Sequence, residues 1–169
     1  VKSGENIDTG FQNTAVGYQA LRRGSGAAGE GNTASNNVAV GYRALYQATD
    51  GNENVAIGST ALDSLTTGVY NVGVGYGSLA AVTTGQYCVA VGQAAGGSVT
   101  SGWYSTFLGG GAGISATTAS GSVFLGYQTG YDIVSGNQNI AIGYQTMKGS
   151  AVTGDHNIAI GAHAGDALT

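Results

Sequence analysis

Near the end of the chain, two aspartates and two histidines stand close together: Asp155, His156, His163 and Asp166. Imidazole and carboxylate groups are zinc ligands, but a zinc site needs three or four ligands at characteristic spacings. His156 and His163 have no third ligand at such a spacing. We therefore interpret these residues as polar groups of exposed turns, and we expect neither a metal site nor a cofactor.

Motifs on which an enzyme could be built are missing from the rest of the sequence. No nucleophile elbow, P-loop or dinucleotide-binding fingerprint lies between a strand and a helix, and Gly-x-Gly strings follow from a content of 32 glycines. The single cysteine, Cys88, has no partner for a disulfide within the chain and no suitably spaced metal ligand. We expect no catalytic residue and a protein that is not an enzyme.

Aromatic residues recur at one position of the sequence. Tyr70, Tyr87 and Tyr104 follow one another at equal intervals, and Trp103 adjoins the last of them. Aromatic rings have large flat apolar faces that suit sugar rings, so these four residues are candidates for a glycan-binding site. Alternatively, the tyrosines shield an edge of the fold or pack against a neighbouring chain. The sequence leaves both interpretations open.

Composition limits the class of protein and its partners. Of 169 residues, 32 are glycine, none is proline, 42% are hydrophobic and 8% are charged, and the net charge is −4. Disorder would require low hydrophobicity, and collagen would require glycine at every third position with proline. The few basic residues and the lack of a long apolar run predict no nucleic-acid partner and no membrane insertion. With neither an initiator methionine nor a signal peptide, the chain is predicted to be a segment of a longer fibre.

A short motif ending in Ala-Val-Gly, or a close variant, recurs along the chain. Its closing glycines are Gly17, Gly41, Gly58, Gly75, Gly92, Gly109, Gly126, Gly143 and Gly161. From Gly41 to Gly143 these anchors follow a strict 17-residue period, while the first interval is longer and the last is longer by one. A fixed period of this kind is typical of a solenoid, in which each coil stacks on the next. We predict a single repeat domain over residues 1–169, with an insertion loop at about residues 23–31.

Each coil is predicted to consist of short strands. Val38 and Val40 precede the anchor Gly41 with Ala39 between them, and the other coils repeat this alternation. We expect the β-branched side chains to fill the interior and the small residue to admit a close neighbour. A second strand is predicted at the Leu-Thr-Thr-Gly segment of residues 65–68 and at its equivalents. The predicted fold is an all-β parallel β-solenoid, or β-roll, of about nine 17-residue coils with two short strands each.

Two further columns predict how the coils are held together. Asparagine stands four residues before most anchors, where we expect a structural ladder of hydrogen bonds between side chains. The ladder comprises Asn13, Asn37, Asn54, Asn71, Asn139 and Asn157. Leucine stands four residues after the early anchors and gives way to glycine in the coils around Phe107 and Phe124. We expect these phenylalanine rings to fill the space that leucine fills elsewhere.

The repeated segments NTAVGYQAL, NVAVGYRAL, NIAIGYQTM and NIAIGAHAG resemble those of two groups of fibrous proteins. One is the YadA-like head repeat of trimeric autotransporter adhesins, a left-handed parallel β-roll built around an NSVAIG core. The other is the NTAVGYQAL-type repeat of phage tail-fibre proteins and related surface proteins. The resemblance implies a left-handed roll, a homotrimer about a common axis and no catalytic residue in the roll. The 17-residue period and the two phenylalanines depart from the family pattern.

Together these features predict a structural and adhesive segment of a trimeric fibre, which attaches to a host or surface receptor. We expect it outside the cell, on a virion tail fibre or a bacterial surface. Its expected partners are further copies of itself, adjacent fibre domains at both ends, and a cell-surface glycan or protein receptor. Two alternatives stay open: the head of a bacterial trimeric autotransporter adhesin, and an ice- or glycan-binding β-solenoid with threonine pairs such as Thr66-Thr67 on one face.

Overall fold

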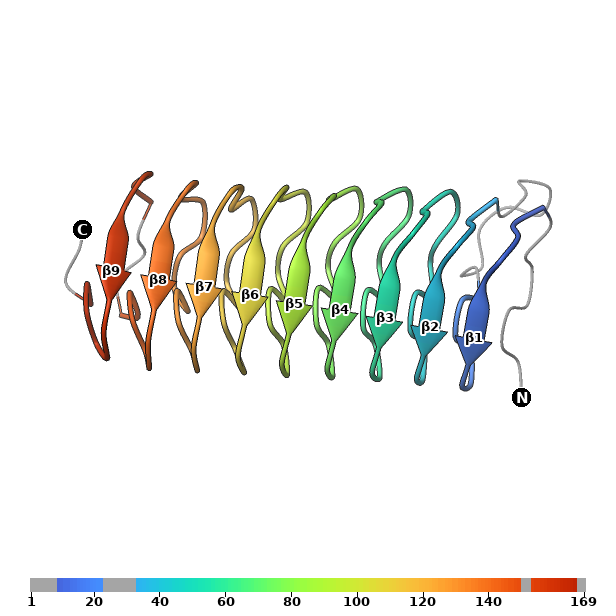
Figure 1. Cartoon of the computed structure of the whole chain (residues 1–169), viewed down its shortest axis with the longest axis horizontal. Helices are drawn as coiled ribbons and strands as arrows, with labels where there is room; N and C mark the ends of the chain where they lie inside the picture. The colour runs from blue at the N-terminus through green and yellow to red at the C-terminus, as the bar shows by residue number, and fades with distance from the viewer. Residues whose placement is uncertain (1–8, 23–32, 150–152, 167–169) are drawn as a thin grey trace.

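The computed structural model describes residues 9–22, 33–149 and 153–166. This part of the chain winds into a stack of coils, and each coil contributes one strand of three residues (Figure 1). The strands are β1 (Thr14–Val16), β2 (Val38–Val40), β3 (Val55–Ile57), β4 (Val72–Val74), β5 (Val89–Val91), β6 (Thr106–Leu108), β7 (Val123–Leu125), β8 (Ile140–Ile142) and β9 (Ile158–Ile160). Among the described residues, every regular element is a strand.

The strands form one parallel sheet in which each pairs with the next in the sequence, so that β1 and β9 lie at opposite ends of the stack (Figure 1). The register places equivalent residues of the repeat opposite one another, as Val38 opposite Val55. From β2 to β8, successive strands begin at equal intervals along the chain. The predicted all-β parallel β-solenoid with a 17-residue repeat is therefore confirmed. The insertion loop predicted at about residues 23–31 lies outside the described residues.

The prediction of a second strand in each coil is wrong. The Leu-Thr-Thr-Gly segments form bends, in which Leu65 and Gly68 are buried, Thr66 is half-buried and Thr67 is exposed. Buried residues therefore recur at every third position, whereas a strand would bury every second one. The N–H groups of Thr66 and Thr67 both donate to the carbonyl oxygen of Thr83, at 2.9 and 3.3 Å, whereas successive N–H groups in a ladder point to opposite sides. Each coil thus turns a corner here and has one strand rather than two.

The strands face the opposite way from the prediction. Their middle residues point inward, and Ala56 and Phe107 are fully buried. The flanking residues Val55 and Ile57 lie on the outer face, where they are half-buried and exposed respectively. The reason is the narrow coil: leucines from the opposite wall reach the strand, and an added Cβ at Gly73 of β4 would lie only 3.3 Å from Cγ of Leu62. The interior behind the strand therefore has room for a small middle residue only.

Phenylalanine replaces leucine in the interior, as predicted. Phe107 and Phe124 are fully buried. An added Cβ at Gly113 would lie 2.5 Å from Cδ1 of Phe107 and 2.8 Å from Cδ2 of Phe124. One at Gly96 would lie 2.9 Å both from Cδ2 of Phe107 and from Cδ2 of Leu79. The two rings therefore take up the volume that leucine fills in the preceding coils.

Asparagine side chains connect the coils along one corner. In Asn54, Oδ1 accepts a hydrogen bond from the backbone N–H of Asn71 at 2.9 Å, and Nδ2 donates to the carbonyl oxygen of Gly68 at 2.9 Å. Asn37 and Asn71 bond the equivalent backbone groups of the coils that follow them. Where serine stands in the column, the hydroxyl of Ser105 makes the same two kinds of bond. The column therefore satisfies backbone groups that are buried between successive coils.

The anchor glycines lie where neighbouring coils approach most closely. Gly75 has a φ of +129°, and an added Cβ would lie 2.6 Å from the carbonyl oxygen of Gly92. The N–H of Gly92 in turn donates to the carbonyl oxygen of Val74 at 2.8 Å. Both the backbone conformation and the lack of space exclude a side chain here. This is why every coil closes with glycine at this position.

Replacing an anchor glycine should destabilise the stack far more than replacing a glycine two residues away. Gly75→Ala combines a strained φ with a clash against Gly92, and we expect it to lower the free energy of unfolding by about 3–5 kcal/mol. Gly77 has a φ of +64° and open space around an added Cβ, so Gly77→Ala should cost about 1 kcal/mol. Urea unfolding followed by circular dichroism measures both. Equal effects of the two variants would contradict the proposed role of the anchor.

The asparagine ladder should tolerate serine but not alanine. Asn54→Ala leaves the N–H of Asn71 and the carbonyl oxygen of Gly68 buried without a partner. We expect a loss of about 2–5 kcal/mol in the free energy of unfolding. Asn54→Ser should cost about 1 kcal/mol, because serine makes both bonds at Ser105. Thermal unfolding compares the two variants, and an Asn54→Ala protein as stable as the wild type would show that the ladder is dispensable.

Because phenylalanine and leucine fill the same interior space, a leucine should restore stability that is lost when a phenylalanine is removed. Phe107→Ala empties the space beside Gly96 and should cost about 3–5 kcal/mol in the free energy of unfolding. In that background, Gly96→Leu should restore about half of the loss, because Leu79 in the preceding coil packs in the same way. In the wild-type background, Gly96→Leu should instead destabilise, since its Cβ would meet the ring of Phe107. A double-mutant cycle in urea tests this, and simple additivity would refute it.

Candidate functional site

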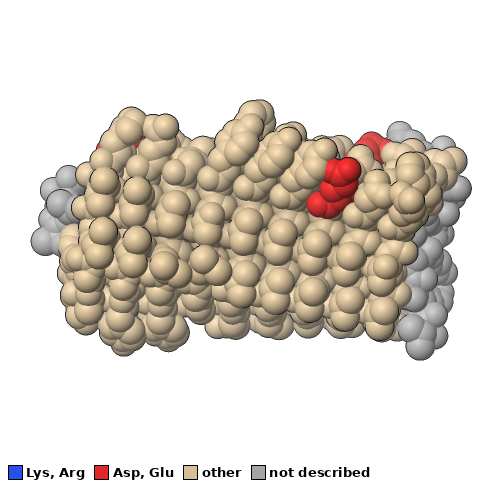
Figure 2. All heavy atoms as spheres, viewed as in Figure 1, with Lys and Arg blue, Asp and Glu red and all other residues tan. Residues whose placement is uncertain are grey.

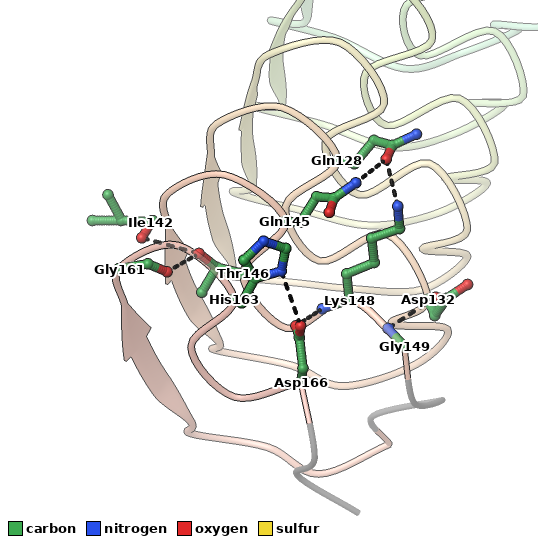
Figure 3. Close-up of polar contacts among 10 residues, drawn as sticks. All are labelled: Gln128, Asp132, Ile142, Gln145, Thr146, Lys148, Gly149, Gly161, His163 and Asp166. Atoms are coloured by element: carbon green, nitrogen blue, oxygen red, sulfur yellow. Dashed lines mark hydrogen bonds and ion pairs between the residues drawn. The ribbon is translucent and has the colours of Figure 1, made fainter.

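Of the histidines and aspartates near the end of the chain, Asp155, His156 and His163 are exposed and Asp166 is half-buried. Figure 3 shows His163 and Asp166. Nδ1 of His163 is 3.3 Å from Oδ2 of Asp166, and Oδ1 of Asp166 accepts a hydrogen bond from the backbone N–H of Lys148 at 3.0 Å. His156 lies elsewhere, and its backbone N–H donates to the carbonyl oxygen of Asn137. Within the described ranges, no group of three or more His, Cys, Asp or Glu side chains could hold a metal ion. The contacts of Asp166 therefore tie the last described turn to the preceding coil.

Cys88 stands in the column of the asparagine ladder, where other coils have asparagine or serine. Its thiol is buried and donates to the carbonyl oxygen of Gly102 at 3.2 Å. Burial raises the pKa of this thiol, and hydrogen bonds from the backbone of Ser105 and Tyr104 lower it only in part. A thiol that stays protonated is a poor nucleophile and a poor metal ligand. The structure gives Cys88 a packing role.

The four predicted aromatic residues come together on one edge of the stack. The rings of Tyr70 and Tyr87 are stacked with centroids 4.9 Å apart, and those of Tyr87 and Tyr104 are stacked at 5.2 Å. Trp103 meets Tyr104 edge to face at 6.4 Å. We call Tyr70, Tyr87 and Tyr104 the tyrosine ladder. All three of its side chains are partly exposed.

Stacking changes what the tyrosine ladder offers to a ligand. The ring of Tyr87 faces a neighbouring ring on both sides, at the spacing of the coils. A sugar ring needs an open aromatic face, so the ladder is not a continuous platform. Only the end members, Tyr70 and Tyr104, have a side on which no further ring of the column stacks, because Glu53 and Gly121 take the place of tyrosine in the coils beyond.

A pocket at the Tyr70 end of the ladder was not predicted from the sequence. It has a volume of about 450 Å³, and Phe11, Ser35, Asn36, Asn52, Glu53 and Tyr70 are among its lining residues. A hydrogen bond to the carboxylate of Glu53 raises the pKa of the Tyr70 hydroxyl. The signal for this pocket was the change from tyrosine to Glu53 and Asn36 within one column of the repeat. We call this pocket the notch.

The outer face of the sheet presents a long apolar surface. It consists of the two flanking columns of the strands, with Val16, Ile57, Val91, Leu125, Ile158 and Ile160 exposed. A second column of exposed tyrosines directly follows the anchors, comprising Tyr18, Tyr42, Tyr76, Tyr127 and Tyr144. Figure 2 shows a broad face without Lys or Arg, on which acidic side chains lie only in the upper part of the view. Contiguous apolar surface of this kind typically marks an interaction site.

The threonine pairs present less surface than the sequence suggested. The hydroxyl of Thr66 donates to the carbonyl oxygen of Thr83 at 3.0 Å, and Thr83 and Thr100 bond the following coils in the same way. These hydroxyls therefore hold the coils together. Only the second residue of each pair, such as Thr67, projects freely, and a single column is narrow for a flat ice-binding face.

Comparisons of the chain with protein-family models, with curated proteins and with solved structures found no match. The resemblance to adhesin head repeats and tail-fibre repeats therefore stays a prediction. The part of the chain that the structure describes contains no helix of the length and hydrophobicity needed to cross a membrane.

Proposed function

We propose that this chain is a non-enzymatic segment of an extracellular fibre. In this fibre, three copies of the chain, each a left-handed solenoid, pack side by side along their outer sheet faces. The observation that carries the proposal is the uncharged, apolar outer face of the sheet. A monomer would leave the exposed side chains of Ile57, Val91 and Leu125 in water along most of its length. Burial against another copy removes this apolar area from water, which is the main favourable term in association.

Each copy has two apolar strips, the outer strand columns and the column of tyrosines that follows the anchors. Two different strips favour a closed ring of copies over a two-fold dimer. The strand columns and the tyrosine column lie on the two sides of the anchor glycines, and they differ in shape and chemistry. A ring forms when one strip of each copy packs against the other strip of the next. The number three comes from the resemblance of the repeats to trimeric head repeats. Adjacent fibre domains would cover the strand edges of β1 and β9, which would otherwise invite unwanted pairing.

The biological role that fits such a rod is attachment of a virion tail fibre, or a similar appendage, to a host or surface receptor. A long uniform rod positions a binding surface away from the particle or cell that carries it. The head of a bacterial trimeric adhesin would use the same architecture, and only the neighbouring domains of the full protein distinguish the two. The bonded threonine hydroxyls make an ice-binding role less suited to this surface.

A charge on the outer sheet face should separate the copies. Light scattering of the purified chain should give a mass three times that of the 16.6 kDa monomer. Ile57→Glu should shift the protein to the monomer mass, because burying an unpaired carboxylate costs about 3 kcal/mol or more at each interface. Thr67→Glu, which changes an exposed residue of a bend, is the matched control and should stay trimeric.

A wild-type protein that stays monomeric at micromolar concentration would contradict the proposal. A trimer that Ile57→Glu leaves intact would show that the copies pack through another surface. Circular dichroism of each variant establishes that the coil itself is still folded.

A further inference from the structure

We propose that the notch between Phe11 and Tyr70 is a binding site for a neutral pyranose unit of an oligosaccharide. The inference deepens the proposed attachment role and rests on it for its biological meaning. The binding itself needs only one chain, because the residues that line the notch all belong to the same copy.

The dimensions of the notch follow from the repeat. Phe11 precedes β1 and Tyr70 precedes β4, so the coils of β2 and β3 lie between them. Three coil spacings of about 4.8 Å separate the two aromatic residues by roughly 14 Å. The coils between them carry small or polar residues at these positions, and the resulting hollow has a volume of about 450 Å³. A space of this size accommodates one or two sugar rings and sits at the lower end of the range for ligand pockets.

The aromatic wall of the notch is held in place before any ligand arrives. One face of the Tyr70 ring is stacked on Tyr87 at a centroid distance of 4.9 Å and an interplanar angle of 13°. The column holds Glu53 in the next coil toward β1, so no second ring of the column stacks on the other side of Tyr70, and Tyr70 lines the notch. The apolar face of a pyranose ring can stack there, and a pre-oriented ring loses little entropy on binding.

Polar groups lie beside this wall, some bonded within the coil and others left to meet a ligand. The carboxylate of Glu53 lies near enough to the Tyr70 hydroxyl to raise its pKa, and as an acceptor with several lone pairs it can accept hydrogen bonds from a ligand. Oδ1 of Asn52 accepts from the backbone N–H of Ser35 at 2.8 Å, which fixes that amide. The backbone N–H of Asn36 donates to the carbonyl oxygen of Phe11 at 3.0 Å, while the side chain of Asn36 is exposed. The notch therefore combines an apolar wall with two groups that can bond a ligand, the carboxylate of Glu53 and the side-chain amide of Asn36.

The charge of the notch selects the class of sugar. Glu53 is a lining residue, Asp50 lies close in the same coil, and neither Lys nor Arg is among the lining residues. Carboxylates repel an anionic sugar and accept hydrogen bonds from neutral hydroxyls. We therefore expect preference for neutral hexose or N-acetylhexosamine units over sialylated or uronic-acid units.

The opposite end of the tyrosine ladder provides a matched control. Tyr104 also lacks a stacked ring on its outer side, because Gly121 follows it in the column. Tyr104 shares with Tyr70 a positive φ, at 58° and 59° respectively, and a stacked neighbour in Tyr87. The lining residues of the notch do not include Tyr104. Replacing either tyrosine should therefore remove one end ring of the tyrosine ladder, while only Tyr70 bears on the notch.

The test is binding of the purified chain to an array of immobilised lactose, maltotriose, chitotriose and 3′-sialyllactose, followed by calorimetric titration of the strongest neutral sugar. Tyr70→Ala should weaken that affinity by at least about tenfold, while Tyr104→Ala should change it by less than about twofold. Tyr70→Phe keeps the ring and should retain more affinity than Tyr70→Ala. Glu53→Gln should narrow the preference for neutral over sialylated sugar. Thermal unfolding of each variant shows whether it is folded.

Three results would overturn the inference: no binding of any neutral sugar, equal losses in Tyr70→Ala and Tyr104→Ala, or a preference for 3′-sialyllactose. Binding of a proline-rich peptide in place of sugars, lost in Tyr70→Ala, would also overturn it, since a proline ring can stack on the same face. The mass of the wild-type protein in light scattering tests the proposed trimer independently of sugar binding. A trimer that binds no sugar would overturn the inference alone, and a sugar-binding monomer would contradict the trimer alone.

Discussion

The contact of backbone against backbone at the anchor glycines is the constraint on which the rest of the structure depends. At Gly75, a single added carbon would lie 2.6 Å from the carbonyl oxygen of Gly92. Each anchor therefore brings its coil close enough for the sheet, the asparagine ladder and the bends to bond in the same register. Because every coil repeats this contact, each is stabilised mainly by its two neighbours, as in other solenoids.

The thinness of the coil determines which surfaces are left for function. Leu62 and its equivalents fill the interior from the wall opposite the strand, so that only small middle residues, or two phenylalanines facing glycines, fit behind the sheet. The β-branched residues of the strands are consequently placed outside, where they form a long apolar face. The same regular spacing stacks tyrosine rings and closes most of their faces. The proposed function therefore rests on the apolar face as a whole and on the places where a column changes residue type.

Much of the structure of each coil could be predicted because equivalent positions of successive repeats carry the same residue type many times. The strand positions, the anchors and the exchange of leucine for Phe107 and Phe124 all followed from such columns. Which side chains of each strand face inward could not be predicted. Val-Ala-Val alternates equally well in either orientation, and the thickness of the coil decides between the two. The prediction of a second strand was wrong because buried residues recur there at every third position, at Leu65 and Gly68, and not at every second position as in a strand. The notch was missed because its residues come from four successive coils.

Amide hydrogen exchange resolved to single residues tests the central claim most directly. The N–H groups of Gly58, Gly75 and Gly92 donate to carbonyl oxygens of the preceding coil at 2.7 to 2.8 Å, whereas the N–H of Tyr76, directly after an anchor, makes no such inter-coil bond. The structure predicts slow exchange at the anchors and fast exchange at the residue that follows, repeated once in every coil from β2 to β8. Protection without this period, or equal exchange at Gly75 and Tyr76, would contradict a stack held together at its anchor glycines.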